Sequence, residues 1–96
     1  MTPILHPSAL RELADAIIAS DAIAAGLGNK LLDEIARIVS LLCEAPGIGR
    51  PLDGGRRQFP VGRFPYVLIY RTDGSRLRVI ALAHRRRNPR YWAHRI

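Results

Sequence analysis

Cysteine is almost absent from this chain of 96 residues, because Cys43 stands alone. A single cysteine cannot form a disulfide framework or a cysteine-based metal site within the chain, and its apolar helical surroundings predict a small core residue. The sequence has no uncharged apolar run near the roughly 18 residues of a membrane span. It also begins without the charged start and long apolar run of a signal peptide. These absences favour a cytoplasmic protein that does not enter a membrane.

Several catalytic signatures are missing as well. The glycines at 47–49 and 54–55 lack the lysine and the following helix of a phosphate-binding P-loop. No serine lies in a nucleophile elbow, and Asp53 and Asp73 are typical of turns rather than of a catalytic carboxylate pair. The three histidines are scattered, without carboxylate or cysteine companions at metal-ligand spacing. We therefore predict neither a metal site nor a cofactor.

Acidic residues are scarce in the second half of the chain. Residues 1–49 hold three basic and six acidic residues, a net charge of −3, whereas residues 50–96 hold twelve arginines against two aspartates, a net charge of +10. Such asymmetry indicates binding to nucleic acid or to an acidic protein, the alternative being a basic face that only contacts water. The almost exclusive use of arginine favours bidentate recognition of phosphate or carboxylate.

The basic charge is densest directly after an apolar, strand-like run at residues 79–83. This C-terminal segment contains His84, Arg85, Arg86, Arg87, Arg90, Tyr91, Trp92, His94 and Arg95. If the chain stays extended past His84, Arg85 and Arg87 share one side and can clamp a phosphate, while Tyr91 and Trp92 can stack on a base. Alternatively, Trp92 or Tyr91 packs against the edge of the core and pins the segment. His84 is either a general acid or base or a hydrogen-bonded residue that fixes the strand end.

Hydrophobic periodicity predicts two helices that form an antiparallel hairpin. Pro7 and Ser8 are typical of a helix start, directly after His6, which we interpret as a local structural residue. The first apolar face consists of Leu10, Leu13, Ala14, Ile17 and Ile18. Residues 26–29 interrupt the pattern, and Asn29 is expected to cap the second helix, which ends before Pro46. Its apolar face consists of Leu31, Leu32, Ile35, Ile38, Val39 and Leu42.

Strand patterns surround the helices. Residues 4–5 are a short apolar start, residues 56–61 a weak strand that Pro60 confines to a sheet edge, and residues 64–70 a strand rich in β-branched and aromatic residues. Asp73-Gly74 predicts a hairpin turn into residues 76–83. One face of that last strand is expected to carry Leu77, Val79, Ala81 and Ala83.

The order of these elements predicts one α+β domain over residues 1–96, with the helical hairpin packed on one face of a small antiparallel sheet. Between the helices and the sheet we expect to find buried Ile17, Ile35, Leu42, Val79 and Ala81.

Five segments carry a family resemblance in the same order, at residues 8–13, 26–28, 45–52, 63–71 and 83–92, and so span essentially the whole chain. The most specific are Phe-Pro-Tyr-x-x-x-Tyr-Arg at 64–71 and Ala-His-x-Arg-Arg-x-Pro-x-Tyr-Trp at 83–92. Together they resemble the ParE/RelE toxin superfamily of type II toxin–antitoxin systems, and the ParE branch of plasmid-stabilisation proteins most of all. The resemblance implies a RelE/ParE-like fold and a cytoplasmic, growth-inhibiting toxin. It also implies a cognate antitoxin, ParD-like with an acidic C-terminal segment, that neutralises the toxin.

The resemblance leaves two activities open. ParE-branch toxins inhibit DNA gyrase by binding, without accepted catalytic residues, and on that interpretation the residues expected to bind the target or the antitoxin are Arg63, Arg85, Arg87, Arg90, Tyr91 and Trp92. RelE-branch toxins are ribosome-dependent mRNA endoribonucleases, and there Arg85 matches a strand-end arginine, Tyr91 matches a tail tyrosine, and His84 would move protons.

Three departures from the RelE pattern favour the ParE interpretation. Val67 stands where the nuclease branch has a mid-sheet arginine, and Gln58 and Pro60 stand near its expected lysines. We therefore predict a ParE-like gyrase inhibitor rather than a ribonuclease.

Overall fold

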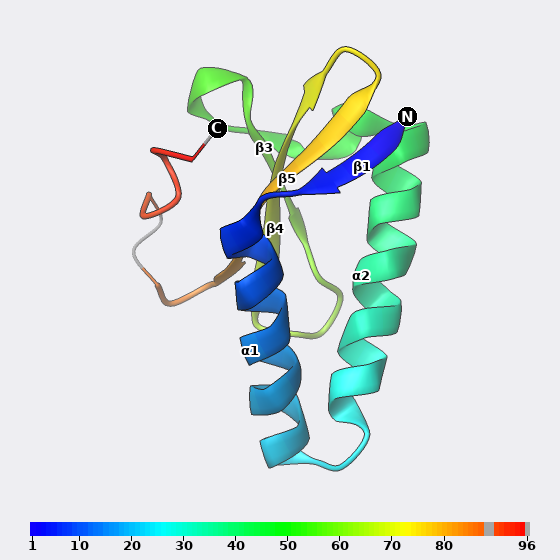
Figure 1. Cartoon of the computed structure of the whole chain (residues 1–96), viewed down its shortest axis with the longest axis vertical. Coiled ribbons are helices and arrows are strands. Elements are labelled where there is room, and N and C mark those ends of the chain that lie inside the picture. The colour runs from blue at the N-terminus through cyan, green and yellow to red at the C-terminus, as the bar shows by residue number, and fades with distance from the viewer. Residues whose placement is uncertain (88–89, 96) are drawn as a thin grey trace.

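The chain is described by a computed structural model over residues 1–87 and 90–95, so that Asn88 and Pro89 of the 83–92 segment, and Ile96, lie outside the described residues. The elements are β1 (Thr2–Leu5), α1 (Pro7–Ile23), α2 (Leu27–Glu44), β2 (Arg50–Pro51), β3 (Arg57–Pro60), β4 (Tyr66–Asp73) and β5 (Arg76–His84). Short 3₁₀ turns lie at Pro46–Ile48 and Asp53–Gly55. In Figure 1, the helical hairpin turns at the bottom of the view, and the C-terminal segment folds back at the left.

Five strands form one sheet in the order β1-β5-β4-β3-β2. The pairs from β2 to β5 are antiparallel, as predicted, and the helices pack on one face, which confirms the α+β arrangement. β1 differs, because it pairs in parallel with β5 through Leu5 and Val79 and makes the sheet mixed. A parallel pair needs a long connection, because a tight turn can join only antiparallel strands. The chain between β1 and β5 provides this length, since it includes both α1 and α2. β3 does not form the sheet edge, since β2 covers part of it.

Local capping explains where the helices begin. The His6 Nδ1 atom accepts a hydrogen bond of 3.0 Å from the Ser8 amide at the start of α1, which confirms its local role. The prediction that Asn29 caps α2 is wrong, because α2 already begins at Leu27 after Gly26, whose φ is 86°. The missing cap comes from α1 instead: Asp21 Oδ1 accepts a hydrogen bond of 2.8 Å from the Gly28 amide. A carboxylate at a helix N-terminus also has a favourable interaction with the helix dipole.

Gly28 lies where α2 closely approaches α1. A Cβ atom at this position would lie 2.8 Å from both Cγ2 and the carbonyl oxygen of Ile17. Because the carbonyl belongs to the α1 backbone, we expect Gly28→Ala to lower the free energy of unfolding by about 1–3 kcal/mol, the usual cost of overpacking. Urea titration measures this change, with Gly47→Ala as the control because a Cβ there meets nothing within 4 Å. Equal stability of the two variants would contradict the close helix contact.

The sheet has a core on each face. The helix side buries residues from both helices, from β4 and β5, and from the loop between β3 and β4: Ala9, Ala16, Leu31, Ile35, Ile38, Leu42, Val61, Leu68, Tyr70, Leu77, Val79 and Leu82. The opposite side buries Ile69, Ile80, Ala81, Ala83 and Trp92. The C-terminal segment therefore acts as a third layer, beneath the sheet and opposite the helices.

A β-bulge affects which residues of β5 are buried in each of the two cores. Ile69 pairs with Ala81 whereas the next residue, Tyr70, pairs with Val79, so that Ile80 is an extra residue in β5. The expectation that Val79, Ala81 and Ala83 share a face is therefore wrong, because an inserted residue reverses the alternation of side chains. Ala81 is buried as expected, but against Trp92 rather than the helices.

The buried side of α1 is narrower than its apolar periodicity predicts. Small residues make its closest contacts: Ala9, Ala16 and Ser20 are buried. Ile17, expected in the core, is half-buried. Leu10 and Ile18 are exposed, with 56% and 69% of their surfaces accessible. α1 therefore carries more apolar surface than this chain itself covers.

Candidate functional site

The C-terminal segment is attached to the sheet through Trp92 and Arg56. Trp92 keeps 7% of its surface accessible and packs against Ile69, Ile80 and Ala81, as the pinning alternative predicts. The Arg56 guanidinium lies 5.6 Å from the Trp92 ring centroid and donates hydrogen bonds to the carbonyl oxygens of Ala93, at 2.8 Å, and Arg95, at 3.2 Å. A buried tryptophan is not available to stack on a base in this arrangement.

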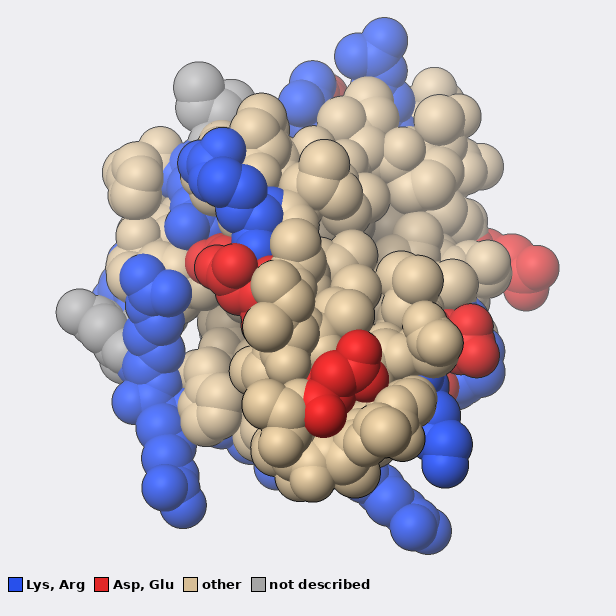
Figure 2. All heavy atoms as spheres, turned by 60° about the horizontal axis from the view of Figure 1, so that its bottom comes forward, with Lys and Arg blue, Asp and Glu red and all other residues tan. Residues whose placement is uncertain are grey.

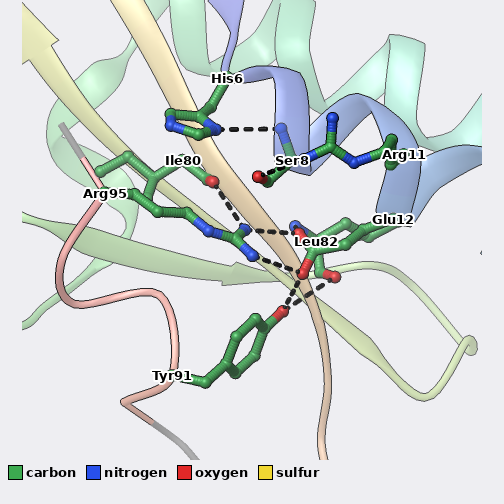
Figure 3. A network of polar contacts seen from close by, with 8 residues as sticks. All are labelled: His6, Ser8, Arg11, Glu12, Ile80, Leu82, Tyr91 and Arg95. Atoms are coloured by element: carbon green, nitrogen blue, oxygen red, sulfur yellow. Dashed lines mark hydrogen bonds and ion pairs between the residues drawn. The ribbon is translucent and has the colours of Figure 1, made fainter.

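A second attachment runs to helix α1 and centres on the Glu12 carboxylate (Figure 3). The Tyr91 hydroxyl donates to Glu12 Oε2 at 2.5 Å, and Arg95 donates to the two carboxylate oxygens at 2.8 and 3.2 Å. The Leu82 amide of β5 donates to Oε1 at 3.2 Å. One carboxylate therefore joins a helix, the central strand and the C-terminal segment through charge-assisted hydrogen bonds, which are about twice as strong as neutral ones.

The Tyr91 hydroxyl is held in its protonated form. Burial and then the hydrogen bond to Glu12 raise the pKa of Tyr91 to about 12, although Arg87 and Arg95 oppose the shift. Near neutral pH the hydroxyl therefore acts as a donor that is already committed to a carboxylate. A group with so high a pKa is also far from the value that suits a general acid or base at that pH.

The residues at the end of β5 line a groove of about 320 Å³ on the sheet face opposite the helices. Its floor is apolar and includes Val67, Ile69 and Ala83, while Arg85 and Arg87 line its rim. The chain turns after His84 rather than staying extended, yet Arg85 and Arg87 still border the same groove. We call this hollow the sheet groove.

Side chains at the rim of the sheet groove are held in different ways. The Arg87 guanidinium lies 3.9 Å from the centroid of the Tyr91 ring, a cation–π contact. His84 packs edge-on against Tyr66, with ring centroids 5.4 Å apart, and its Nδ1 accepts a hydrogen bond of 3.1 Å from the Arg86 amide. Arg85 is exposed, and within the part of the chain that the structure describes no carboxylate forms an ion pair with it.

Two of the predicted binding residues lie away from the sheet groove. Arg90 forms an exposed ion pair of 3.3 Å with Asp53 beside a neighbouring hollow. Arg63 lies in the loop between β3 and β4 and lines a separate groove of about 400 Å³ at the turn of the helical hairpin. Of the predicted set, the structure therefore brings Arg85, Arg87 and Trp92 together, with Tyr91 behind Arg87.

The groove that contains Arg63 is mostly apolar and we call it the hairpin groove. Its walls include Ile23 at the end of α1, Leu27 at the start of α2 and Phe64, and its two cationic lining residues are Lys30 and Arg63. Ile23 has 80% of its surface accessible. Figure 2 views this end of the molecule: uncharged side chains make up most of the face, acidic side chains lie among them, and lysine and arginine side chains project from its edges.

Sequence reasoning missed Glu12, Arg56 and Arg95, the residues that hold the C-terminal segment. For Glu12 a signal was present, because it lies three residues after Ala9 and four before Ala16 and so falls on the small-residue side of α1. A carboxylate on the side of a helix that approaches a sheet needs a cationic partner. The basic C-terminal segment supplies that partner, but the pairing of Glu12 with Arg95 spans 83 positions and has no local pattern.

Residues 1–87 and 90–95 lack two features. Within them, no helix combines the length and the apolar character needed to cross a bilayer. The same residues contain no cluster of three or more histidine, cysteine or carboxylate side chains placed to bind a metal ion.

Comparison with known proteins identifies the family. Residues 4–89 match the family model described as the ParE toxin of the type II toxin–antitoxin system parDE. Among solved structures, a chain of a chromosomal ParDE toxin–antitoxin system from P. aeruginosa is similar in fold, with a TM-score of 0.78 at 19% identity, over 88% of this chain and 95% of that chain. A search of curated proteins finds no significant match. The family model covers most of the sequence, and this chain therefore belongs to the ParE toxin family of type II toxin–antitoxin systems.

Proposed function

We propose that this ParE-family toxin inhibits DNA gyrase by binding it, and that the exposed guanidinium pair of Arg85 and Arg87 at the sheet groove contacts the target. The proposal rests on the absence of available catalytic groups at two positions in or beside the groove: Val67 on its floor is apolar, and the Tyr91 hydroxyl already donates a hydrogen bond to Glu12. Two exposed arginines can still make bidentate contacts to carboxylate or phosphate groups.

The alternative is a RelE-like, ribosome-dependent mRNA endoribonuclease. It would need a base or acid near neutral pH beside the scissile phosphate and cations that stabilise the transition state. Arg85 and His84 lie at the sheet groove, but Tyr91 has a pKa of about 12 and donates to Glu12, and Val67 supplies no charge. The arrangement therefore favours binding over catalysis.

We further propose that a ParD-like antitoxin inserts an acidic, amphipathic segment into the hairpin groove. Apolar side chains of that segment would cover Ile23 and Phe64, and its carboxylates would lie beside Lys30 and Arg63. An amphipathic helix that places its apolar face in a hydrophobic groove is a recurring mode of recognition. The opposite charges would speed association more than they determine the final affinity.

The target proposal predicts the effect of Arg85→Ala. We expect this variant to inhibit DNA supercoiling by gyrase at least about tenfold less strongly than the wild type, because a hydrogen bond to a charged group contributes about 1.5–3 kcal/mol. Arg86→Ala is the matched control, since Arg86 is an exposed neighbour that does not line the sheet groove. Both variants should unfold at the wild-type urea concentration.

The same preparations distinguish the alternative function. Wild-type protein that leaves supercoiling unchanged, but cleaves mRNA on translating ribosomes and loses that activity in Tyr91→Phe, would overturn the gyrase proposal in favour of the nuclease. Equal potency of Arg85→Ala and Arg86→Ala in the supercoiling assay would instead remove Arg85 from the target contact.

The antitoxin proposal predicts that Ile23→Asp weakens binding. The probe is the ParD-like antitoxin that we expect to be encoded beside this chain's own gene, and calorimetry should show at least about tenfold weaker binding, the loss typical of an important interface residue. Ile18→Asp is the matched control, because Ile18 is an exposed isoleucine of the same helix outside the hairpin groove. If Ile18→Asp weakens binding about tenfold and Ile23→Asp leaves it unchanged, the antitoxin covers another face of the hairpin.

A further inference from the structure

The Glu12 network lies along the edge of β5 that faces away from β4, in a part that none of the described strands covers. β1 pairs with β5 only as far as Val79, whereas β5 continues to His84. Beyond that point the Leu82 amide donates to Glu12 at 3.2 Å, and the Ile80 carbonyl accepts from Arg95 at 3.2 Å. Glu12 and Arg95 therefore satisfy backbone groups that would otherwise be unpaired at a sheet edge.

The network also reaches the sheet groove through the Tyr91 ring. Glu12 fixes the hydroxyl of Tyr91, and the guanidiniums of Arg87 and Arg95 lie 3.9 and 5.1 Å from the centroid of its ring. Figure 3 shows the Tyr91 and Arg95 side chains, both from the C-terminal segment, converging on Glu12 from α1. Arg95 is held in an ion pair at the carboxylate, whereas Arg87 is left at the rim of the groove.

We propose that Glu12 is a positioning residue of this toxin: through Tyr91 it fixes Arg87 beside Arg85 and so sets the anion-binding geometry of the sheet groove. Glu12 itself does not line the groove. Its carboxylate acts from α1 by holding Tyr91 in a single orientation, and the aromatic ring then provides the surface on which the Arg87 guanidinium lies. The part of this proposal that concerns potency rests on the proposed inhibition of gyrase, whereas the geometry of the groove does not.

Trp92 allows the geometry to be tested without any target, because it is the single tryptophan of the chain and lines the sheet groove. Quenching of its fluorescence by iodide reports both accessibility and local positive potential, whereas quenching by neutral acrylamide reports accessibility alone. The ratio of the two constants therefore measures the positive potential at Trp92, to which Arg85 and Arg87 contribute together with the nearby Arg56, and Arg56 is the same in every variant. We expect Arg87→Ala to lower this ratio.

Glu12→Gln separates positioning from a simple change in charge. Removing a carboxylate raises the net charge by one, and so by electrostatics alone it would increase the iodide ratio. If Glu12 positions Arg87, the ratio instead falls to the Arg87→Ala value, and Glu12→Gln adds no further fall in the Arg87→Ala background. A ratio that is unchanged or higher in Glu12→Gln would overturn the proposal.

A second variant covers the case in which Glu12→Gln does not fold. The double substitution Glu12→Gln with Arg95→Gln removes both charges of the buried pair, so that no unpaired charge is left, and the same fall in the ratio is expected. In the supercoiling assay, Glu12→Gln should lose about tenfold in potency, the scale of one charged contact, and nothing more in the Arg87→Ala background. If wild-type protein does not inhibit gyrase, the proposed function fails and the iodide ratio alone decides the role of Glu12.

Discussion

Glu12→Ala is expected to lower the free energy of unfolding by about 3–5 kcal/mol, the usual cost of removing one partner of a buried ion pair. The pair is mostly shielded from solvent, since Arg95 and Glu12 keep 9% and 13% of their side-chain surfaces accessible. Without the carboxylate, the Arg95 guanidinium loses its anionic partner and keeps the Ile80 carbonyl as an acceptor, while both the Tyr91 hydroxyl and the Leu82 amide lose a hydrogen bond. A loss of this size is a large part of the roughly 5–15 kcal/mol that stabilises a typical domain.

Urea titration measures this loss, and it is preferable to guanidinium, whose ions would screen the charges. Asp15→Ala is the matched control, because Asp15 is an exposed carboxylate on the same helix. Changes on such exposed positions are usually within about 0.5 kcal/mol of zero. If Glu12→Ala and Asp15→Ala have the same stability, the network in Figure 3 does not hold the C-terminal segment.

Ile38→Ala is expected to cost about 2–5 kcal/mol, as large-to-small substitutions in a core do. Ile38 lies on α2 with none of its surface accessible and belongs to the cluster between the helices and the sheet. Truncating its side chain leaves a cavity that neighbouring backbone cannot fill without moving both layers.

The control for this second variant is on the same helix. Leu32 keeps 43% of its surface accessible, so Leu32→Ala should cost much less than Ile38→Ala in the same urea titration. Equal losses at the two positions would show that the buried side of α2 differs from the one described above.

The helices and the central hairpin could be predicted from the sequence because their signals are local. α2 repeats its apolar residues every three or four positions, and this spacing alone places Ile35, Ile38 and Leu42 on the apolar face that the fold buries. Asp73-Gly74 likewise marks the turn between β4 and β5. In both cases the pattern and the packing agree.

The features that were missed depend on contacts between distant residues. The parallel pairing of β1, the cap that Asp21 gives to α2 and the bulge at Ile80 are chosen by the assembled layers rather than by local propensity. The same holds for the candidate site. The arginines after β5 were visible in the sequence, but their arrangement depends on Glu12, which lies 79 positions before Tyr91.

The bulge at Ile80 has a consequence for how this strand can tolerate changes in length. Because Ile80 is an added residue, Ile80 and Ala81 are both buried on the side opposite the helices, and the side chains alternate regularly before and after them. Deleting Ile80 would remove the bulge and leave a strand that alternates regularly, in which Leu82 still faces the helices and Ala83 still packs on the side of Trp92. The strand can thus lose this one residue and keep the facing of both its parts, although it would lose the side chain that Ile80 buries beside Trp92.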